Sequence, residues 1–492
     1  MKLEFAKTPQ GKTVSIPAKL ANRHGLIAGA TGTGKTISLQ VLAERFSRMG
    51  VPVFLADVKG DLSGLSKAGV SSPKLLERCQ KLQLGEPTFS ANPVLFWDVF
   101  GKSGHPARTT LSEMGPLLLS RLMSLNETQT AVLQVAFKIA DDSDLLLLDV
   151  KDLQALLKVI QENLNAFKEQ YGHLSSATLG AIQRGLLGFE THGVTEFFSE
   201  PALNLNDLLQ KDGEGRGFVS ILSAEELLQQ PMVYSTFLLW ILSELFETLP
   251  EVGDQEKPKL VLFIDEAHLL FKEAPKVLVE KVEQVVRLIR SKGVGVYFVT
   301  QSPSDIPEAV LGQLSHRIQH ALRAFTPQDQ KAVKVAAQTL RANPDFSAQE
   351  VITQLGVGEA LVSVLNDDGV PGIVERAFIL PPSSQIGPIS PETRQALIRG
   401  SSLFGRYENK IDRESAFEKL QKKEPSSTNE SQKSVLSEIL LGSTGPRGGR
   451  KAGLLEKAAT SAVRSAANNI GRELARGLLG SLLGSSRSKK RR

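Results

Sequence analysis

Cysteine is nearly absent from this chain, which has 492 residues and a single thiol at Cys79. One thiol forms neither an intramolecular disulfide nor a zinc site built from cysteines, so both classes of architecture are excluded. This scarcity is typical of a reducing compartment, and residues 1–7 lack the apolar segment of a signal peptide. We therefore expect a cytoplasmic protein.

Long apolar segments are also absent. The longest apolar stretch, 233–246, is interrupted by hydroxyl side chains and by Glu244. A helix that crosses a bilayer needs about 20 mainly apolar residues, so this stretch predicts a buried core helix and no transmembrane segment. The composition, 41% hydrophobic and 23% charged, is typical of a globular protein, and the length is typical of about three domains.

A net positive charge is absent except at the C-terminus. The whole chain has a net charge of +5, but residues 446–492 contain twelve Lys or Arg and only two Asp or Glu. The tail alone therefore carries +10, which leaves −5 for residues 1–445. An argument from charge for nucleic acid or acidic lipid as a partner thus concerns the tail and not the body.

A short segment near the start of the chain contains three closely spaced glycines. Residues 29–36 fit the phosphate-binding loop pattern G-x-x-x-x-G-K-[ST] without a mismatch. In this pattern backbone N–H groups face a polyphosphate, the Lys ammonium reaches the β and γ phosphates, and the Thr hydroxyl ligates Mg²⁺. We therefore predict that ATP and Mg²⁺ bind at Gly29, Ala30, Thr31, Gly32, Thr33, Gly34, Lys35 and Thr36.

The residues around this loop predict an α/β fold. A short buried strand is expected at 24–28, an amphipathic helix at 37–49 and a second buried strand at 51–57. A strand, a helix and a strand with short connections form a right-handed unit of a parallel sheet. Further strands are predicted at 217–222, 260–266, 294–301, 317–324, 360–365 and 372–380, so the sheet is expected to be mainly parallel.

Residues 106–200 show helical periodicity with few strand signals, which predicts a helical subdomain inserted into the α/β domain. One segment in this region, 145–149, imitates a strand that ends in an aspartate. We reject it as a strand because the leucines that follow continue at helical spacing.

The remaining chain is expected to consist of helical and flexible segments. Residues 421–453 are rich in polar residues and glycine, which predicts a linker. From 454 to 483 apolar residues recur in pairs every four residues, which predicts a helix in the basic tail. The predicted domains are the two parts of the α/β core (1–105 and 201–382), the helical insertion (106–200), a helical extension (383–420), the linker (421–453) and the Gly/Ala/Leu-rich basic helix and tail (454–492).

Two adjacent carboxylates follow the apolar strand at 260–264. At the carboxyl end of a parallel strand, Asp265 would hold the Mg²⁺ shell and Glu266 would polarise the attacking water. Gln301 ends the next predicted strand, where it would contact the γ-phosphate or the water; a simple turn is the alternative for that residue. Lys35, Glu266 and Gln301 are therefore the predicted catalytic residues.

Phosphoryl transfer is often assisted by an arginine from a neighbouring subunit. Four arginines are candidates for this role, although a surface ion pair explains each one individually. They are Arg23, Arg290, Arg317 and Arg323.

Taken together, four segments resemble the HerA/FtsK branch of RecA-like ATPases: HGLIAGATGTGKT, VFLADVKGDLSG, LVLFIDEAHLLF and GVGVYFVTQSPSDIP. The run FWDVFGKSGHPARTTLSEMGPLLLSRLM and the Gly/Arg-rich tail look like the bacterial YjgR-like subgroup of HerA-like proteins. The resemblance implies a RecA-like P-loop core, usually in a hexameric ring with ATP sites between subunits. It also supports the roles given above to Lys35, Thr36, Asp265, Glu266 and Gln301.

The resemblance implies an ATP-hydrolysing motor that translocates DNA through the ring, without sequence specificity because no motif for base readout is present. The alternative is an ATPase that acts on protein or membrane-associated complexes, with the basic tail as a membrane or partner anchor. DNA-stimulated ATPase activity would favour the first function, and binding of the tail to anionic vesicles would favour the second.

Overall fold

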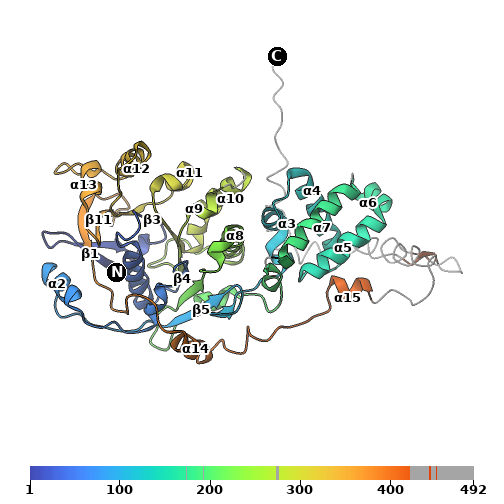
Figure 1. The fold of residues 1–492 in the computed structure, drawn as a ribbon, viewed down its shortest axis with the longest axis horizontal. Coiled ribbons are helices and arrows are strands. Elements are labelled where there is room, and N and C mark those ends of the chain that lie inside the picture. The colour runs from blue at the N-terminus through green and yellow to red at the C-terminus, as the bar shows by residue number, and fades with distance from the viewer. Residues whose placement is uncertain (173, 192, 273–275, 422–442, 445–449, 452–492) are drawn as a thin grey trace, which may run out of the picture. The chain divides into compact units, whose positions relative to one another are not determined.

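The computed structural model describes residues 1–421 except 173, 192 and 273–275, together with 443–444 and 450–451. The described chain divides into two compact units (Figure 1). The first unit contains 1–108 and 201–410, and the second contains 109–200 and the described residues from 411 onward. These divisions place the end of the predicted helical extension, 411–420, with the second unit rather than with the first.

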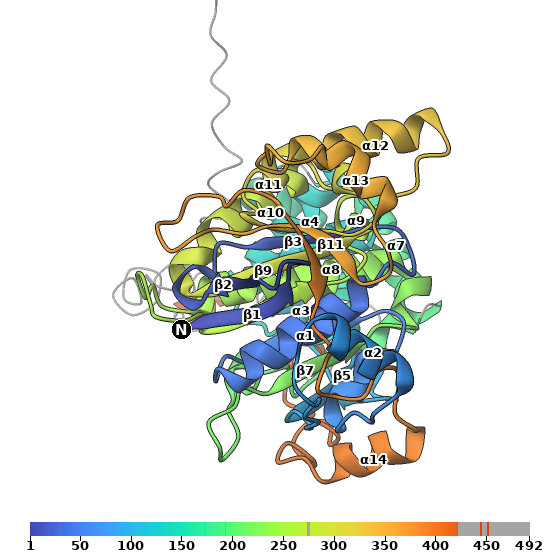
Figure 2. The same ribbon diagram turned by 90° about the vertical axis from the view of Figure 1, so that its left-hand side faces the viewer.

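One twelve-stranded sheet forms the centre of the first unit (Figure 2). Its order is β2-β1-β12-β11-β10-β3-β9-β8-β4-β7-β5-β6, and every pair from β10 to β6 is parallel. The prediction of a mainly parallel sheet is therefore confirmed. The strands are β1 (Lys2–Lys7), β2 (Thr13–Pro17), β3 (Gly25–Ala28), β4 (Val53–Asp57), β5 (Val94–Asp98), β6 (His105–Pro106), β7 (Val219–Ser223), β8 (Leu260–Ile264), β9 (Val294–Thr300), β10 (His316–Gln319), β11 (Glu359–Ser363) and β12 (Glu375–Ile379).

The central strands are mainly apolar because both faces of the sheet are covered. Every residue of β3, β4, β8 and β9 is buried. Alternate residues of these strands belong to one core with α1 (Lys35–Arg48), and the residues between them are equally buried. On the other face α10 (Lys276–Ile289) contacts β9 and packs on α8 (Pro231–Thr248). Burial on both faces is the usual condition of a parallel sheet.

The edges of the sheet contain strands that were not predicted from the sequence. The hairpin of β1 and β2 joins the antiparallel edge through β1 and β12. At the other edge β5 pairs with β7 and carries the two-residue strand β6. These strands are short or only half apolar, so they give weak sequence signals, and partners far along the chain determine their pairing.

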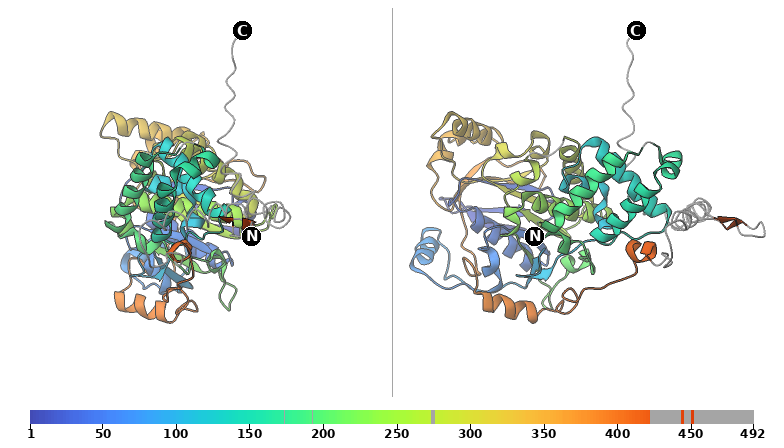
Figure 3. Two further views of the ribbon diagram at one scale, coloured as in Figure 1. Left: turned by 90° about the vertical axis from the view of Figure 1, so that its right-hand side faces the viewer. Right: turned by 45° about the vertical axis from the view of Figure 1, so that its right-hand side comes forward.

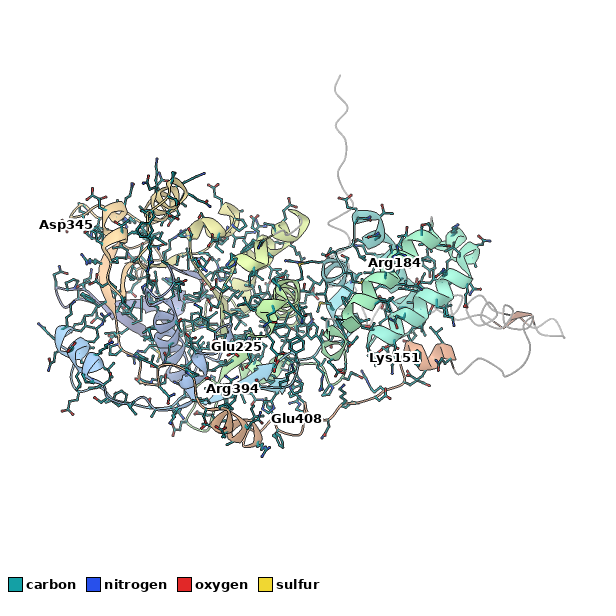
Figure 4. The ribbon with its side chains drawn as sticks, viewed as in Figure 1. Lys151, Arg184, Glu225, Asp345, Arg394 and Glu408 are labelled. Carbon is teal, nitrogen blue, oxygen red and sulfur yellow. The ribbon has the colours of Figure 1, made fainter. Side chains whose placement is uncertain are left out.

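The last segment of the first unit is fixed to the sheet edge at β5 and β6. Arg394 of α14 (Pro391–Arg399) donates a hydrogen bond to Ser223 Oγ at 2.8 Å and lies over the Phe96 ring (Figure 4). Further along, Glu408 is 2.6 Å from Nδ1 of the buried His105. The chain after β12 therefore continues as an integral part of the first unit up to Lys410.

The second unit is a group of helices (Figure 3). Its core is formed where α3 packs on α4 and where α7 packs on α4 and α5, and α15 packs on α5. Asp149 is the N-cap of α5 and accepts a hydrogen bond from the Asp152 N–H, so the rejection of 145–149 as a strand is confirmed. The helices are α3 (Leu111–Leu122), α4 (Glu127–Asp142), α5 (Val150–Glu162), α6 (Leu164–Tyr171), α7 (Ser176–Thr191) and α15 (Ala416–Gln421).

The predicted linker at 421–453 and the predicted basic helix at 454–492 lie outside the described residues, except for Gln421 and the short strands β13 (Ser443–Thr444) and β14 (Arg450–Lys451). Within the part of the chain that the structure describes, every helix is too short or too polar to cross a bilayer.

Two histidines are buried where β3, β9 and β10 meet. Nδ1 of His24 accepts a hydrogen bond from the Val296 N–H at 3.0 Å, and Nε2 of His316 is 2.9 Å from the Leu20 carbonyl oxygen. Burial removes the charged imidazolium from water, which lowers the pKa of His24 to about 3 and that of His316 to about 4. Both rings are therefore neutral in the folded protein at neutral pH.

The burial of His316 predicts a pH-dependent loss of stability. Between pH 6.5 and 4 the unfolded chain binds a proton at this residue and the folded chain does not. The free energy of unfolding therefore decreases as the pH is lowered through this range. Replacing His316 by Gln should remove up to about 1.4 kcal/mol of this loss for each pH unit. Urea unfolding followed by tryptophan fluorescence measures it, because Trp97 and Trp240 both lie in the first unit. If the free energy of unfolding showed the same dependence on pH in the wild type and in the variant, the prediction would be contradicted.

Candidate nucleotide site

The loop at 29–34 connects the carboxyl end of β3 to the first residue of α1. Gly32 and Gly34 adopt positive φ angles of 79° and 112°, which L side chains rarely adopt. Gly29 lacks room for a side chain, because a Cβ there would lie 2.5 Å from His320 Cβ. The glycines therefore give the loop its shape, and α1 points its positive end towards the loop.

The Lys35 side chain is buried against this loop. Its ammonium donates hydrogen bonds to the carbonyl oxygens of Gly29 at 2.5 Å and Ala30 at 3.1 Å. These bonds occupy two of the three N–H donors of the group, so one remains for a ligand. Burial lowers the pKa of Lys35, and the nearby Lys59 lowers it further. A buried cation with a spare donor is suited to bind a phosphate oxygen.

The loop is supported by the residues that directly follow β10 and precede β11, a contact between segments too far apart in the chain for a sequence pattern to predict. The Ala30 N–H donates a hydrogen bond to the Ala321 carbonyl oxygen at 2.8 Å. The Gly358 N–H donates one to the Thr33 carbonyl oxygen at 2.9 Å. His320 lies 2.8 Å from both Ser38 Oγ and the Glu359 carbonyl oxygen. Burial lowers the pKa of His320 to about 4. A neutral histidine therefore joins the loop, α1 and β11.

The chain after β12 returns to α1 and borders the site. The buried carboxylate of Glu44 accepts hydrogen bonds from the backbone N–H groups of Ser383, at 2.9 Å, and Ser384, at 2.8 Å. Gln40 donates to Ser384 Oγ at 2.7 Å and to the Gln385 carbonyl oxygen at 2.9 Å. These contacts hold the next two residues, Ile386 and Gly387, beside the phosphate loop.

A pocket of about 280 Å³ lies over the loop. One side is formed by the loop and α1, another by the turn after β4, and a third by the segments at 357 and 386–387. Thr36 lines this pocket, and it lies near Asp61, whose pKa is raised by burial and moderated by the Thr36 side chain. The lining residues are Gly32, Gly34, Lys35, Thr36, Ile37, Gln40, Lys59, Asp61, Val357, Ile386 and Gly387.

Asp265 and Glu266 follow β8, two strands away from β3 in the sheet. Burial raises the pKa of Asp265 to about 7, and the charge of Glu266 raises it as well. Both carboxylates lie near enough to Lys35 to raise the pKa of its ammonium. The structure therefore brings these two residues, which lie 230 and 231 positions after Lys35 in the sequence, to the same site as the loop.

The backbone at Glu266 is strained. Its φ angle is 45°, which is uncommon for a residue with a side chain and costs about 1–3 kcal/mol. The hydroxyl of Tyr234 donates to the Asp265 carbonyl oxygen at 2.6 Å and so holds the strained peptide. Glu266 Oε2 is buried and accepts no hydrogen bond, although His268 Nδ1 is 3.3 Å away. A buried carboxylate oxygen without a donor is available to a ligand or a water molecule.

These observations fit a nucleoside triphosphate with Mg²⁺. Gly29 has no room for a Cβ, Gly32 and Gly34 have positive φ angles, the Lys35 ammonium has a spare donor, and Glu266 Oε2 accepts no hydrogen bond. The hard oxygen ligands that Mg²⁺ prefers are present as the Thr36 hydroxyl and the Asp265 carboxylate. A bound cation would also favour the ionised form of Asp265, whose pKa burial raises.

Gln301 lies directly after β9, which is between β3 and β8 in the sheet. Its side chain is exposed and is not part of the pocket lining. The preceding residue, Thr300, is fixed by a 2.7 Å hydrogen bond from its hydroxyl to Asp305. The structure therefore places Gln301 at the correct edge of the sheet, and its contact with a phosphate stays a prediction.

The pocket lining includes none of the four candidate arginines. Arg23 and Arg290 lie near each other, and the charge of Arg23 lowers the pKa of Arg290 in addition to burial. Arg317 donates to the Leu311 carbonyl oxygen at 2.9 Å and borders a separate groove. Arg323 is exposed in the chain after β10. A role of any of them in a neighbouring subunit stays a prediction.

Comparisons with known proteins agree with this geometry. The sequence model of a family described as "Helicase HerA-like C-terminal" matches residues 2–489. The "DNA double-strand break repair helicase HerA" of Saccharolobus solfataricus is 24% identical over 370 residues, which are 72% of this chain and 64% of that protein. The chain thus spans less than two thirds of the length of this curated relative.

Two solved structures have a similar fold. Plasmid coupling protein TrwB in complex with a non-hydrolysable ATP analogue has a TM-score of 0.51 at 15% identity, over 80% of this chain and 92% of that chain. VirB4 of Thermoanaerobacter pseudethanolicus has a TM-score of 0.50 at 14% identity, over 80% of this chain and 98% of that chain. The expected RecA-like P-loop fold is therefore confirmed.

Proposed function

The chain belongs to the helicase HerA-like C-terminal family, and from this membership and the geometry of the site we propose that it is a Mg²⁺-dependent ATPase. The observation that carries the proposal is the meeting of the phosphate loop with the two carboxylates after β8. The charges of Asp265 and Glu266 both raise the pKa of the Lys35 ammonium, which supports a role of all three groups on one bound nucleotide.

In this proposal each residue has one role. The loop N–H groups and Lys35 hold the phosphates, and Thr36 and Asp265 hold the metal ion. Mg²⁺ would neutralise charge on the phosphate oxygens. Glu266 orients the attacking water and accepts its proton, and Gln301 contacts the water or the γ-phosphate.

The ATPase is proposed to drive a homo-oligomeric ring, a hexamer by resemblance, that translocates DNA in the cytoplasm. A curated relative is described as a DNA double-strand break repair helicase, which supports DNA as the substrate. The net charge of +10 in residues 446–492 supports binding to a polyanion without sequence specificity. Assignment to the YjgR-like subgroup also stays a proposal.

A measurement of ATP turnover on protein of known oligomeric state tests this function. Single-stranded DNA, double-stranded DNA and anionic vesicles are added in separate experiments at low salt. We expect DNA to increase turnover, and we expect this increase to decline steeply between about 50 and 200 mM salt because counterions compete for the phosphates. Stimulation by vesicles and not by DNA would instead favour the membrane-associated ATPase. No turnover under any condition would contradict the ATPase assignment itself.

A further inference from the structure

The pocket over the phosphate loop contains a second lysine that lies outside the loop motif. Lys59 lines this pocket together with Lys35 and Thr36, and its side chain is exposed. Among the residues that the structure describes, it has no ion-pair partner. Exposed lysines are commonly solvated and without a role. A role of Lys59 therefore depends on whether its turn holds it at the pocket.

The turn is held in one shape by a buried carboxylate at the end of β4. Asp57 is 1% exposed and accepts three backbone hydrogen bonds, from Lys59 at 3.3 Å, Gly60 at 2.8 Å and Leu62 at 3.0 Å. Gly60 has a φ of 73°, and a Cβ there would overlap the Glu225 carboxylate. The backbone of Lys59 is therefore fixed at the rim of the pocket, and only its side chain is free to move.

The ammonium of Lys59 lies close to the groups assigned to hydrolysis. Burial lowers the pKa of the Lys35 ammonium and raises the pKa values of the Asp61 and Asp265 carboxyls. The positive charge of Lys59 adds to the first shift and opposes the other two. Such effects are short-ranged in water. Together with the pocket lining, they place Lys59 near the phosphate loop and near the carboxylates of Asp61 and Asp265.

The transition state of phosphoryl transfer carries charge on the equatorial oxygens of the transferred group, and a cation supplied within the same chain or by a neighbour stabilises it. The four candidate arginines would act from a neighbouring subunit, whereas Lys59 lines the pocket of its own chain. We propose that Lys59 is a catalytic residue that acts within its own chain and contacts the terminal phosphate of ATP. The inference rests on the proposed ATPase function and adds a residue to its site.

The reaction itself remains ordinary hydrolysis. The oxygen of water forms a bond to the γ-phosphorus, the bond from that phosphorus to the β–γ bridging oxygen breaks, and ADP and phosphate leave. The proton of the water passes to Glu266. Lys59 forms no covalent bond and keeps its proton, because its contribution is to stabilise the negative charge on the γ-phosphate oxygens.

Replacing Lys59 by Met tests the proposal, because methionine keeps an unbranched side chain and removes the charge. We expect kcat to fall by about 100-fold or more, as when one donor to a developing oxyanion is removed. The affinity for ATP should fall, whereas the affinity for ADP, which lacks the contacted phosphate, should stay within about twofold of the wild type. Replacing Lys59 by Arg should restore part of kcat.

The exposed Lys74 of α2 (Pro73–Lys81) supplies the matched control, and Lys74→Met should leave kcat and both affinities unchanged. Unchanged kcat in Lys59→Met would overturn the proposal. Equal weakening of ATP and ADP would also overturn it, because it would indicate a general effect on the turn. If the wild-type protein neither bound nor hydrolysed ATP, the ATPase function would fail before Lys59 was tested, so the two failures are distinguishable.

Discussion

Lys35→Ala should abolish ATP binding, with an increase in Kd of more than about 100-fold. The lysine is the only residue of the loop motif that brings a full positive charge to the phosphates. Each charge-assisted hydrogen bond contributes about 1.5–3 kcal/mol, and about 1.4 kcal/mol corresponds to a factor of ten in affinity. Isothermal titration calorimetry with ATP and Mg²⁺ measures the loss.

The control for this variant is Lys334→Ala, at an exposed position of α12 (Pro327–Gln338), which should bind ATP as the wild type does. Because the Lys35 ammonium also bonds to the loop carbonyls of Gly29 and Ala30, the melting temperature should be measured in parallel. A folded Lys35→Ala protein with unchanged ATP affinity would contradict the assignment of the loop.

Glu266→Gln should keep ATP binding and lower kcat by about 100- to 10,000-fold, the range expected when a general base is lost. Glutamine has the same shape as glutamate, so the strained backbone and the bond between Tyr234 and Asp265 should be retained. The amide does not accept a proton from water, and the enzyme should accumulate with bound ATP. Single-turnover kinetics with quantification of bound nucleotide measures both effects.

A suitable control is Glu350→Gln in α13 (Ala348–Gln354), where the side chain is exposed and lies outside the pocket lining. This variant should hydrolyse ATP at the wild-type rate. Normal turnover in Glu266→Gln would show that another group activates the water, whereas loss of ATP binding would assign Glu266 to the ground-state contacts instead.

The sequence predicted the central strands and the ends at which functional residues lie, because these features are local. A run of apolar residues followed by Asp265 and Glu266 predicts both a buried strand and the edge where it ends. The loop at 29–36 is equally local, since its shape is determined by its own glycines. The parallel sheet follows from the alternation of such strands with amphipathic helices.

The supports of the site were not predictable from the sequence. Glu44 and Ser384 are hydrogen-bonded although they are 340 positions apart in the sequence, and His320 and Ser38 although they are 282 positions apart. A polar residue within an apolar pattern gives no indication of a partner so distant in the chain. The strain at Glu266 also depends on neighbours, because Tyr234 of α8 holds the peptide before it.

The sequence by itself determined the phosphate loop, the carboxylates after β8 and the α/β class, since each depends on residues adjacent in the chain. Only the tertiary structure decided how these parts are arranged. In the sheet, β9 lies between β3 and β8. Hydrogen bonds of His320 and Glu44 hold the loop and the chain after β12 against α1, and Lys59 lines the pocket. The physical reason is that motifs follow from local backbone geometry, whereas the positions of side chains around a site depend on packing between segments hundreds of residues apart.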